Sequence, residues 1–157
     1  MATRSIVAEP YGDGWRGRYV HWDGSPNTRV LQLQLLVARD GVEMVRDTIV
    51  HKHLSWSTIN PAESSQKEKP LEEWRTEWRT EDEPRFALVE GYGIVHNDIE
   101  QSEADKWMFS CTDLDFAWAE YLYILGDSTI IVCEYVNEQW QPLSVERYTT
   151  LKLTSKG

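Results

Sequence analysis

Two short segments of this sequence carry the residue types of acid–base chemistry. His21 and Asp23 flank a tryptophan, and His96 and Asp98 repeat the same His-x-Asp spacing. Residues two apart share a face of an extended chain, so each carboxylate can orient an imidazole that titrates near neutral pH. If the segments lie within about 10 Å of each other, they would line one cleft for a small ligand, nucleotide or metal. The simpler interpretation is an Asp-Gly turn beside a hydrogen-bonded strand histidine.

A second candidate for ligand binding is basic. Arg16 and Arg18 alternate with Trp15 and Tyr19 along one predicted strand, and Arg4 precedes them in the chain. Arginines on one face of a strand, with aromatic rings on the other, would suit a nucleotide or an acidic peptide. The alternative is that these arginines simply face solvent.

Other catalytic signatures are weak. A G-x-S-x-G elbow and a P-loop are missing, and we predict no cofactor and no metal site. Cys111 precedes an aspartate and Cys133 lies in an apolar run, settings that do not favour a thiolate. His51 and His53 would diverge on a helix and fit better as its cationic C-terminal end.

The elements that would position these residues begin with an N-terminal hairpin, predicted from strands at 5–9 and 16–22. A helix then starts near Asn27 or Thr28 and places Val30, Leu31, Leu35 and Leu36 near one face. Asp40-Gly41 interrupts it, and a second helix carrying Val42, Val45 and Ile49 continues toward residue 53.

The C-terminal half predicts more strands. Residues 86–95 resemble one strand with a glycine bulge, and 107–111 a short strand. The apolar runs 118–125 and 129–135 flank Gly126-Asp127-Ser128 as a hairpin. The predicted fold class is α+β, with an antiparallel sheet built from the N- and C-terminal hairpins and two helices packed on one face.

Length and charge bound the organisation and the partners. The chain has 157 residues and a formal net charge of −10, which suits a single domain spanning 1–157. An acidic, Pro/Glu-rich insertion is predicted at about 60–84. Phosphate backbones and anionic membranes would repel such a chain, so we expect neither direct nucleic-acid binding nor membrane binding. Two cysteines and no signal-peptide pattern favour a cytoplasmic location.

The acidic insertion contains a tandem repeat, Glu73-Trp74-Arg75-Thr76 followed by Glu77-Trp78-Arg79-Thr80. On a helix started by Pro70, Trp74 and Trp78 would share one face and Glu73, Glu77 and Glu81 another. Tryptophan is enriched at interface hot spots, so this ridge is a candidate partner-binding surface. The alternative is a short helix packed on its own domain.

Several segments together resemble a family of small phage, prophage and actinobacterial proteins. The relevant residues are Thr3-Arg4-Ser5-Ile6, the hexapeptide His21-Trp22-Asp23-Gly24-Ser25-Pro26, and Val95-His96-Asn97-Asp98. The family pattern is a T-R-S-x-I start and an H-W-D-G-Y-P motif, in which Ser25 replaces the usual tyrosine here. The resemblance implies a setting and no particular chemistry.

Three functional hypotheses follow. The first is a small acidic phage-type accessory protein that binds a host protein, for example to inhibit a defence or nucleic-acid-processing system. The second is a small-ligand or nucleotide binder, or a hydrolase, that uses the two His-x-Asp segments. The third is an assembly protein that forms homo-oligomers. Without a strong catalytic motif, a binding protein is favoured over an enzyme.

Overall fold

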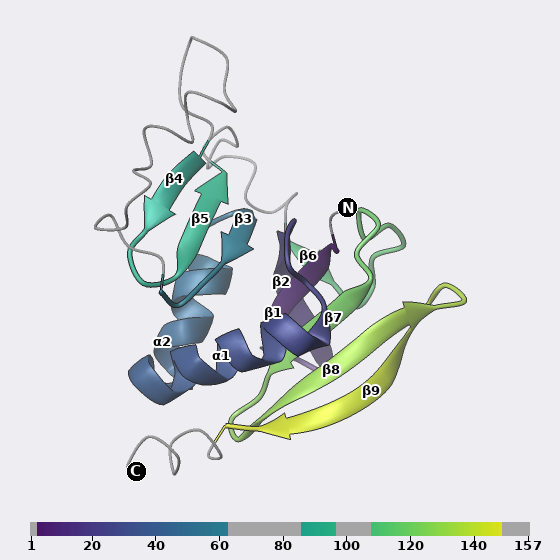
Figure 1. The fold of residues 1–157 in the computed structure, drawn as a ribbon. Coiled ribbons are helices and arrows are strands. Elements are labelled where there is room, and N and C mark those ends of the chain that lie inside the picture. The colour runs from purple at the N-terminus through teal and green to yellow at the C-terminus, as the bar shows by residue number, and fades with distance from the viewer. Residues whose placement is uncertain (1–2, 63–85, 97–107, 149–157) are drawn as a thin grey trace, which may run out of the picture.

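The computed structural model describes residues 3–62, 86–96 and 108–148 of the chain (Figure 1). These residues form one mixed sheet with the strand order β4-β5-β3-β2-β1-β7-β8-β9, and β6 pairs separately with β2. Two helices pack on one face of the sheet, which confirms the predicted α+β class. The expectation of a purely antiparallel sheet was wrong, because β1 pairs with β7 and β2 with β3 in parallel.

The N-terminal hairpin is confirmed. Strands β1 (Ser5–Tyr11) and β2 (Gly14–Val20) pair along their whole length. The turn is tighter than the Pro10–Gly14 sequence suggests, since only Gly12 and Asp13 lie between the strands. Gly12 has a φ of 58°, a left-handed conformation that glycine adopts without steric cost.

The C-terminal hairpin is also confirmed, and a third strand extends it. Strands β7 (Tyr121–Leu125), β8 (Thr129–Val136) and β9 (Gln139–Arg147) form an antiparallel meander. Asn137 and Glu138, with φ of 53° and 64°, make the two-residue turn into β9. The meander joins the N-terminal hairpin through its first strand, which runs in the same direction as β1.

The remaining strands extend the sheet beyond β2. Strand β3 (Trp56–Ile59) pairs with β5 (Gly93–His96), which pairs with β4 (Phe86–Val89). The single strand predicted over 86–95 was wrong, because Glu90, Gly91 and Tyr92 turn the chain back. A Cβ on Gly93 would lie 2.2 Å from the carbonyl oxygen of Thr58, so this glycine permits the close approach of β3. The short β6 (Phe109–Ser110) occupies the other part of the β2 edge.

The break between the two helices lies where the sequence predicts it. Helix α1 (Pro26–Asp40) ends at Gly41, and α2 (Val42–Arg46) continues into a π-helical turn at Asp47–His51. The face predicted for α1 was partly wrong. Leu31 and Leu35 are exposed, whereas Arg29, Leu33 and Leu36 are buried, because a buried arginine here replaces one aliphatic position of the helical stripe.

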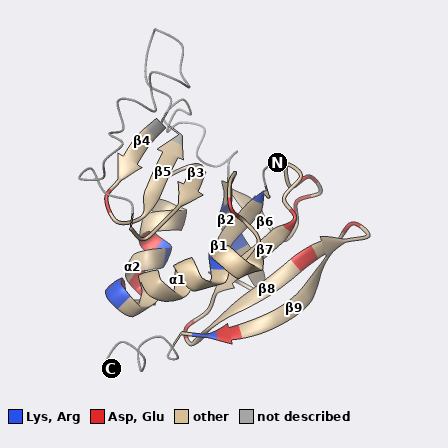
Figure 2. Ribbon diagram, in the orientation of Figure 1, with Lys and Arg blue, Asp and Glu red and all other residues tan. Residues whose placement is uncertain are grey.

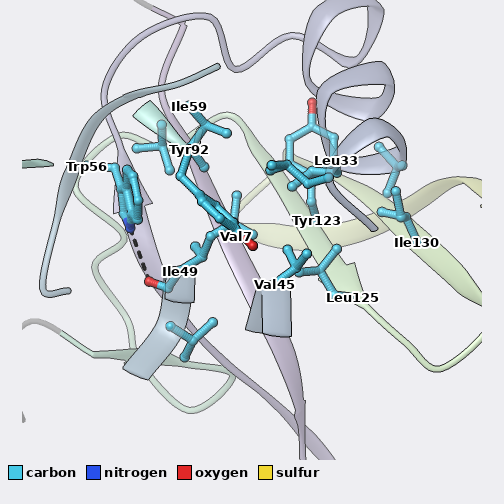
Figure 3. Packing of buried hydrophobic residues seen from close by; sticks show 14 of the residues in the cluster. Val7, Leu33, Val45, Ile49, Trp56, Ile59, Tyr92, Tyr123, Leu125 and Ile130 are labelled. Carbon is cyan, nitrogen blue, oxygen red and sulfur yellow. Dashed lines mark hydrogen bonds between the residues drawn. The ribbon is translucent and has the colours of Figure 1, made fainter. Parts of the chain in front are cut away.

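The main core lies between these helices and the sheet (Figure 3). Leu33 of α1 and Val45 and Ile49 of the second helical segment pack against strand residues that include Val7 and Trp56. The indole Nε1 of Trp56 donates to the backbone oxygen of Ile49 at 3.1 Å. This bond satisfies a polar group that would be costly to bury alone.

Candidate functional site

The hexapeptide His21–Pro26 forms the junction between the sheet and α1. After β2 the chain continues along β3, where the amide nitrogens of His21 and Trp22 donate to the oxygens of Trp56 and Ser57. Asp23 then adopts a φ of 60°. A Cβ on the next residue, Gly24, would lie 2.5 Å from the oxygen of Thr3.

Arg29 of α1 stabilises this junction through hydrogen bonds to the backbone. Its guanidinium is fully buried and donates to the backbone oxygens of Trp22, at 2.5 Å, and Ile59, at 3.4 Å. Burial lowers the pKa of Arg29 to about 10, against the opposing effects of Tyr123 and Asp23. The Tyr123 hydroxyl donates to the backbone oxygen of Gly24 at 2.5 Å. The most recognisable motif of the sequence therefore has a structural explanation that requires no ligand.

His21 faces away from the helices and lies in an aromatic setting. The Tyr19 hydroxyl is 2.9 Å from its Nδ1, and the Trp22 ring packs edge-on against its imidazole. Burial, and then the charge of Arg4, lower the pKa of His21. The charge that acts on His21 is that of a cation, and among the described residues no contact joins its imidazole to the Asp23 carboxylate.

The structure tests the two His-x-Asp segments only through the backbone. Val95 pairs with Trp56, and Trp56 pairs with Val20, so His21 and the end of β5 lie on either side of β3. Adjacent strands are about 4.8 Å apart, which separates these two backbones by roughly 10 Å. Asp98 lies outside the described residues, and a shared cleft stays a prediction.

The proposed arginine face is not an exposed ligand surface. Arg18 is buried, 3% exposed, and its Nε donates to the oxygen of Val50 at 2.7 Å. Arg16 forms a 2.8 Å ion pair with Glu9 and lies over the Tyr11 ring. Both side chains point to the helix-covered side, where they hold the π-helical turn and the hairpin in place.

The predicted partner-binding ridge lies outside the described residues: Glu73, Trp74, Glu77, Trp78 and Glu81. Within the described part of the chain, no three His, Cys, Asp or Glu side chains converge as a metal site would require. His51 ends the π-helical turn, and its Nε2 lies 2.9 Å from Glu9.

On the face opposite the helices, the sheet carries a cluster of aromatic rings. Trp15, Phe116, Tyr135 and Trp140 are linked by ring contacts with centroid distances of 4.8–6.4 Å. Phe116 comes from the segment between β6 and β7, which folds over this face and buries its ring. We call this side of the sheet the aromatic face.

That covering segment turns two side chains outward. Ala117 and Trp118 have φ of 56° and 65°, conformations that cost residues with a side chain roughly 1–3 kcal/mol each. Local hydrogen bonds hold them, including Ala117 N to Asp115 Oδ1 at 2.9 Å and Glu120 N to Arg4 O at 2.8 Å. Trp118 is 82% exposed, and Leu114, earlier in the same segment, is 95% exposed.

Two adjoining hollows of about 510 and 450 Å³ open beside these side chains. Their apolar walls come from Leu114, Phe116, Trp118, Ala119 and Tyr135. Every charged residue of the described chain that lines them is acidic: Asp113, Asp115, Glu120 and Glu138. Figure 2 shows the acidic residues before β7 and at the β8–β9 turn. We call this surface the acidic aromatic hollow.

Sequence reasoning did not identify this site. It assigned Trp118 to a strand, whereas β7 begins only at Tyr121. The available signal was the stretch Asp113–Glu120, DLDFAWAE, in which acidic and apolar residues alternate over the first four positions and an apolar run then leads to Glu120. In a loop, that alternation places some apolar side chains in solvent, where they suit binding rather than folding.

No family model, curated protein or solved structure matches the chain. The resemblance to phage and prophage proteins therefore stays a prediction. In the described residues, no helix is both long and apolar enough to cross a bilayer.

Proposed function

We propose that this protein acts by binding a basic partner protein through the acidic aromatic hollow. The observation that carries the proposal is the pairing of two nearly fully exposed apolar side chains, Leu114 and Trp118, with a wall whose charges are all acidic. Exposed apolar patches mark interaction sites, and tryptophan anchors often dominate their binding energy.

The charge of the surface selects the kind of partner. Carboxylates around an apolar centre complement lysine and arginine, and they accelerate the encounter with a positively charged protein. Proteins that bind nucleic-acid phosphates carry such positively charged surfaces. The protein would then be a phage-type accessory protein that competes with nucleic acid for a host protein. The acidic segment near 60–84 would make a second contact with that host protein.

The His-x-Asp hypothesis receives no comparable support. His21 is engaged by Tyr19 and lies near a cation. The test for that alternative is nucleotide or metal binding that disappears in His21→Gln. We expect no such binding.

The test of the binding function compares two matched double variants. Leu114→Ala with Trp118→Ala removes the exposed anchors, whereas Leu31→Ala with Leu35→Ala removes two exposed leucines from α1. A partner captured from bacterial lysate is purified, and its Kd is measured against each variant. We expect the first variant to weaken binding at least about tenfold and the second to leave it unchanged. Equal affinity for both variants would place the interface elsewhere.

A further inference from the structure

Arg4 lies over the Trp118 ring, beside the acidic aromatic hollow, and is not one of the residues that line the hollow. Its Cζ lies 5.7 Å from the centroid of the Trp118 ring, over the ring face. The backbone oxygen of Arg4 accepts from the amide of Glu120 at 2.8 Å. The chain thus holds its own guanidinium against the ring that it presents to solvent.

We propose that the hollow selects arginine over lysine in its partner, and that Arg4 competes with a partner arginine for the Trp118 ring. This inference rests on the proposed function, because it names the side chain that the same surface would accept. It adds a regulatory element, because in the free protein the Trp118 ring is already in contact with the guanidinium of Arg4.

The chemistry of the hollow favours a guanidinium. A planar guanidinium stacks on an indole and is more weakly hydrated than an ammonium group. It also pairs with carboxylates in a bidentate geometry that lysine cannot match. Asp115 and Glu120 line the same hollow as Trp118, so the hollow offers both an indole ring and carboxylates.

The backbone conformation of the segment before β7 is consistent with a binding role for the Trp118 ring. The positive φ values of Ala117 and Trp118 turn the indole toward solvent. Strained conformations persist only where surrounding contacts hold them, and they gather at binding sites. The intramolecular cation–π contact contributes to holding Trp118 in place, and a partner arginine would preserve that contribution while releasing Arg4.

The experiment uses two peptides of equal charge, alternating glycine with arginine or glycine with lysine, at physiological ionic strength. Each is titrated into the full chain while the indole N–H signals are followed by NMR. Trp118→Leu identifies the Trp118 signal by its loss, and Glu43→Gln, on α2, is the control for removing a distant charge. We expect the arginine peptide to shift the Trp118 signal and to bind about three- to fivefold more tightly than the lysine peptide.

The variants separate ring stacking from charge. In Trp118→Leu the preference for arginine should fall to about one, whereas Glu43→Gln should keep it. Arg4→Met should strengthen binding of the arginine peptide about two- to threefold, and that gain should vanish when Trp118 is already leucine. If Arg4→Met still strengthens peptide binding when Trp118 is leucine, the gain comes from removing a positive charge, and the competitor role of Arg4 is overturned.

The remaining outcomes distinguish the two proposals. Equal affinity of both peptides, with the Trp118 signal shifted in each case, would overturn the arginine preference and leave the proposed function standing. An unshifted Trp118 signal with both peptides would overturn the inference and the basic-partner function together. Because Trp118 is 82% exposed, its replacement should not unfold the chain, and the dispersion of the remaining signals checks this directly.

Discussion

The helix-covered face and the aromatic face of the sheet are closed in different ways. On the helix-covered face, α1, α2 and the π-helical turn bury a mainly aliphatic core together with Trp56, Tyr92 and Tyr123. On the aromatic face, the segment before β7 covers rings from β2, β6, β8 and β9 and leaves Leu114 and Trp118 in solvent. The first arrangement maximises burial, whereas the second retains apolar surface that a partner can bury.

Charged side chains also differ between the two faces. On the helix-covered side, the guanidiniums of Arg18 and Arg29 donate to backbone oxygens between elements. On the aromatic face, the carboxylates stand at the rim of an open hollow. The charged groups of one side therefore hold elements together, and those of the other are available for recognition.

The largest effect is expected from Trp56→Ala on the helix-covered face. Trp56 is fully buried and bonds Ile49, so its removal leaves a large cavity and an unpaired carbonyl. We expect the free energy of unfolding to fall by about 3–5 kcal/mol. Urea denaturation measures this. A loss below about 1 kcal/mol would mean that this face is not the main source of stability.

Arg29→Met tests the junction beneath the hexapeptide. The variant keeps much of the buried volume but leaves the oxygens of Trp22 and Ile59 without their donor. We expect a loss of about 2–3 kcal/mol in the free energy of unfolding, again by urea denaturation. An unchanged midpoint would indicate that water or another group satisfies these oxygens.

Phe116→Ala tests the cover of the aromatic face. The ring contacts Trp15, Tyr135 and Trp140, but the segment that carries it can settle into the space left behind. We therefore expect a smaller loss, about 2 kcal/mol. Amide hydrogen exchange should accelerate at residues 117–120 while the helix amides stay protected. Uniform acceleration across the chain would contradict a locally attached segment.

The pH dependence of stability compares one histidine on each side. Burial lowers the pKa of His21, on the aromatic face, and of His53, which packs on Trp56; Arg4 and Lys52 respectively add to the effect. An unfolded histidine titrates near 6.5. The unfolded chain therefore binds more protons below about pH 6.5, and stability should fall as the pH drops through that value toward the lower folded pKa values.

The measurement is urea denaturation at pH 7.5 and 5.5, with His21→Gln and His53→Gln made singly and together. We expect each substitution to reduce the difference between the two pH values, and the double variant to reduce it most. A double variant with the same pH dependence as the original chain would assign the effect to other groups.

The smallest effect is expected from Trp118→Ala. A side chain that is 82% exposed contributes little to folding, so the free energy of unfolding should change by less than about 0.5 kcal/mol. The comparison with Trp56→Ala then separates a tryptophan that stabilises the fold from one that is available for binding. A loss of more than about 1 kcal/mol would show that Trp118 serves folding.

Local patterns determined much of this fold. Apolar runs on either side of Gly-Asp turns predicted both hairpins, and Asp40-Gly41 predicted the helix break, because turn chemistry and periodicity act between neighbouring residues. The same approach expected a turn at Asp23-Gly24, where the structure has bends at Trp22 and Ser25 and a φ of 60° at Asp23. It also left the two-strand nature of residues 86–96 undetected, since a glycine in a bulge and one in a turn look alike in sequence.

Only the tertiary structure decided which strands meet in parallel, which arginines are buried and which apolar side chains of the segment before β7 are exposed. The β1–β7 pairing depends on contacts between residues more than a hundred positions apart, and no local propensity encodes it. Arg18 resembles a surface residue in sequence, and its burial follows from the position of the π-helical turn. Leu114 and Trp118 are likewise exposed while Phe116, between them, is buried on the aromatic face.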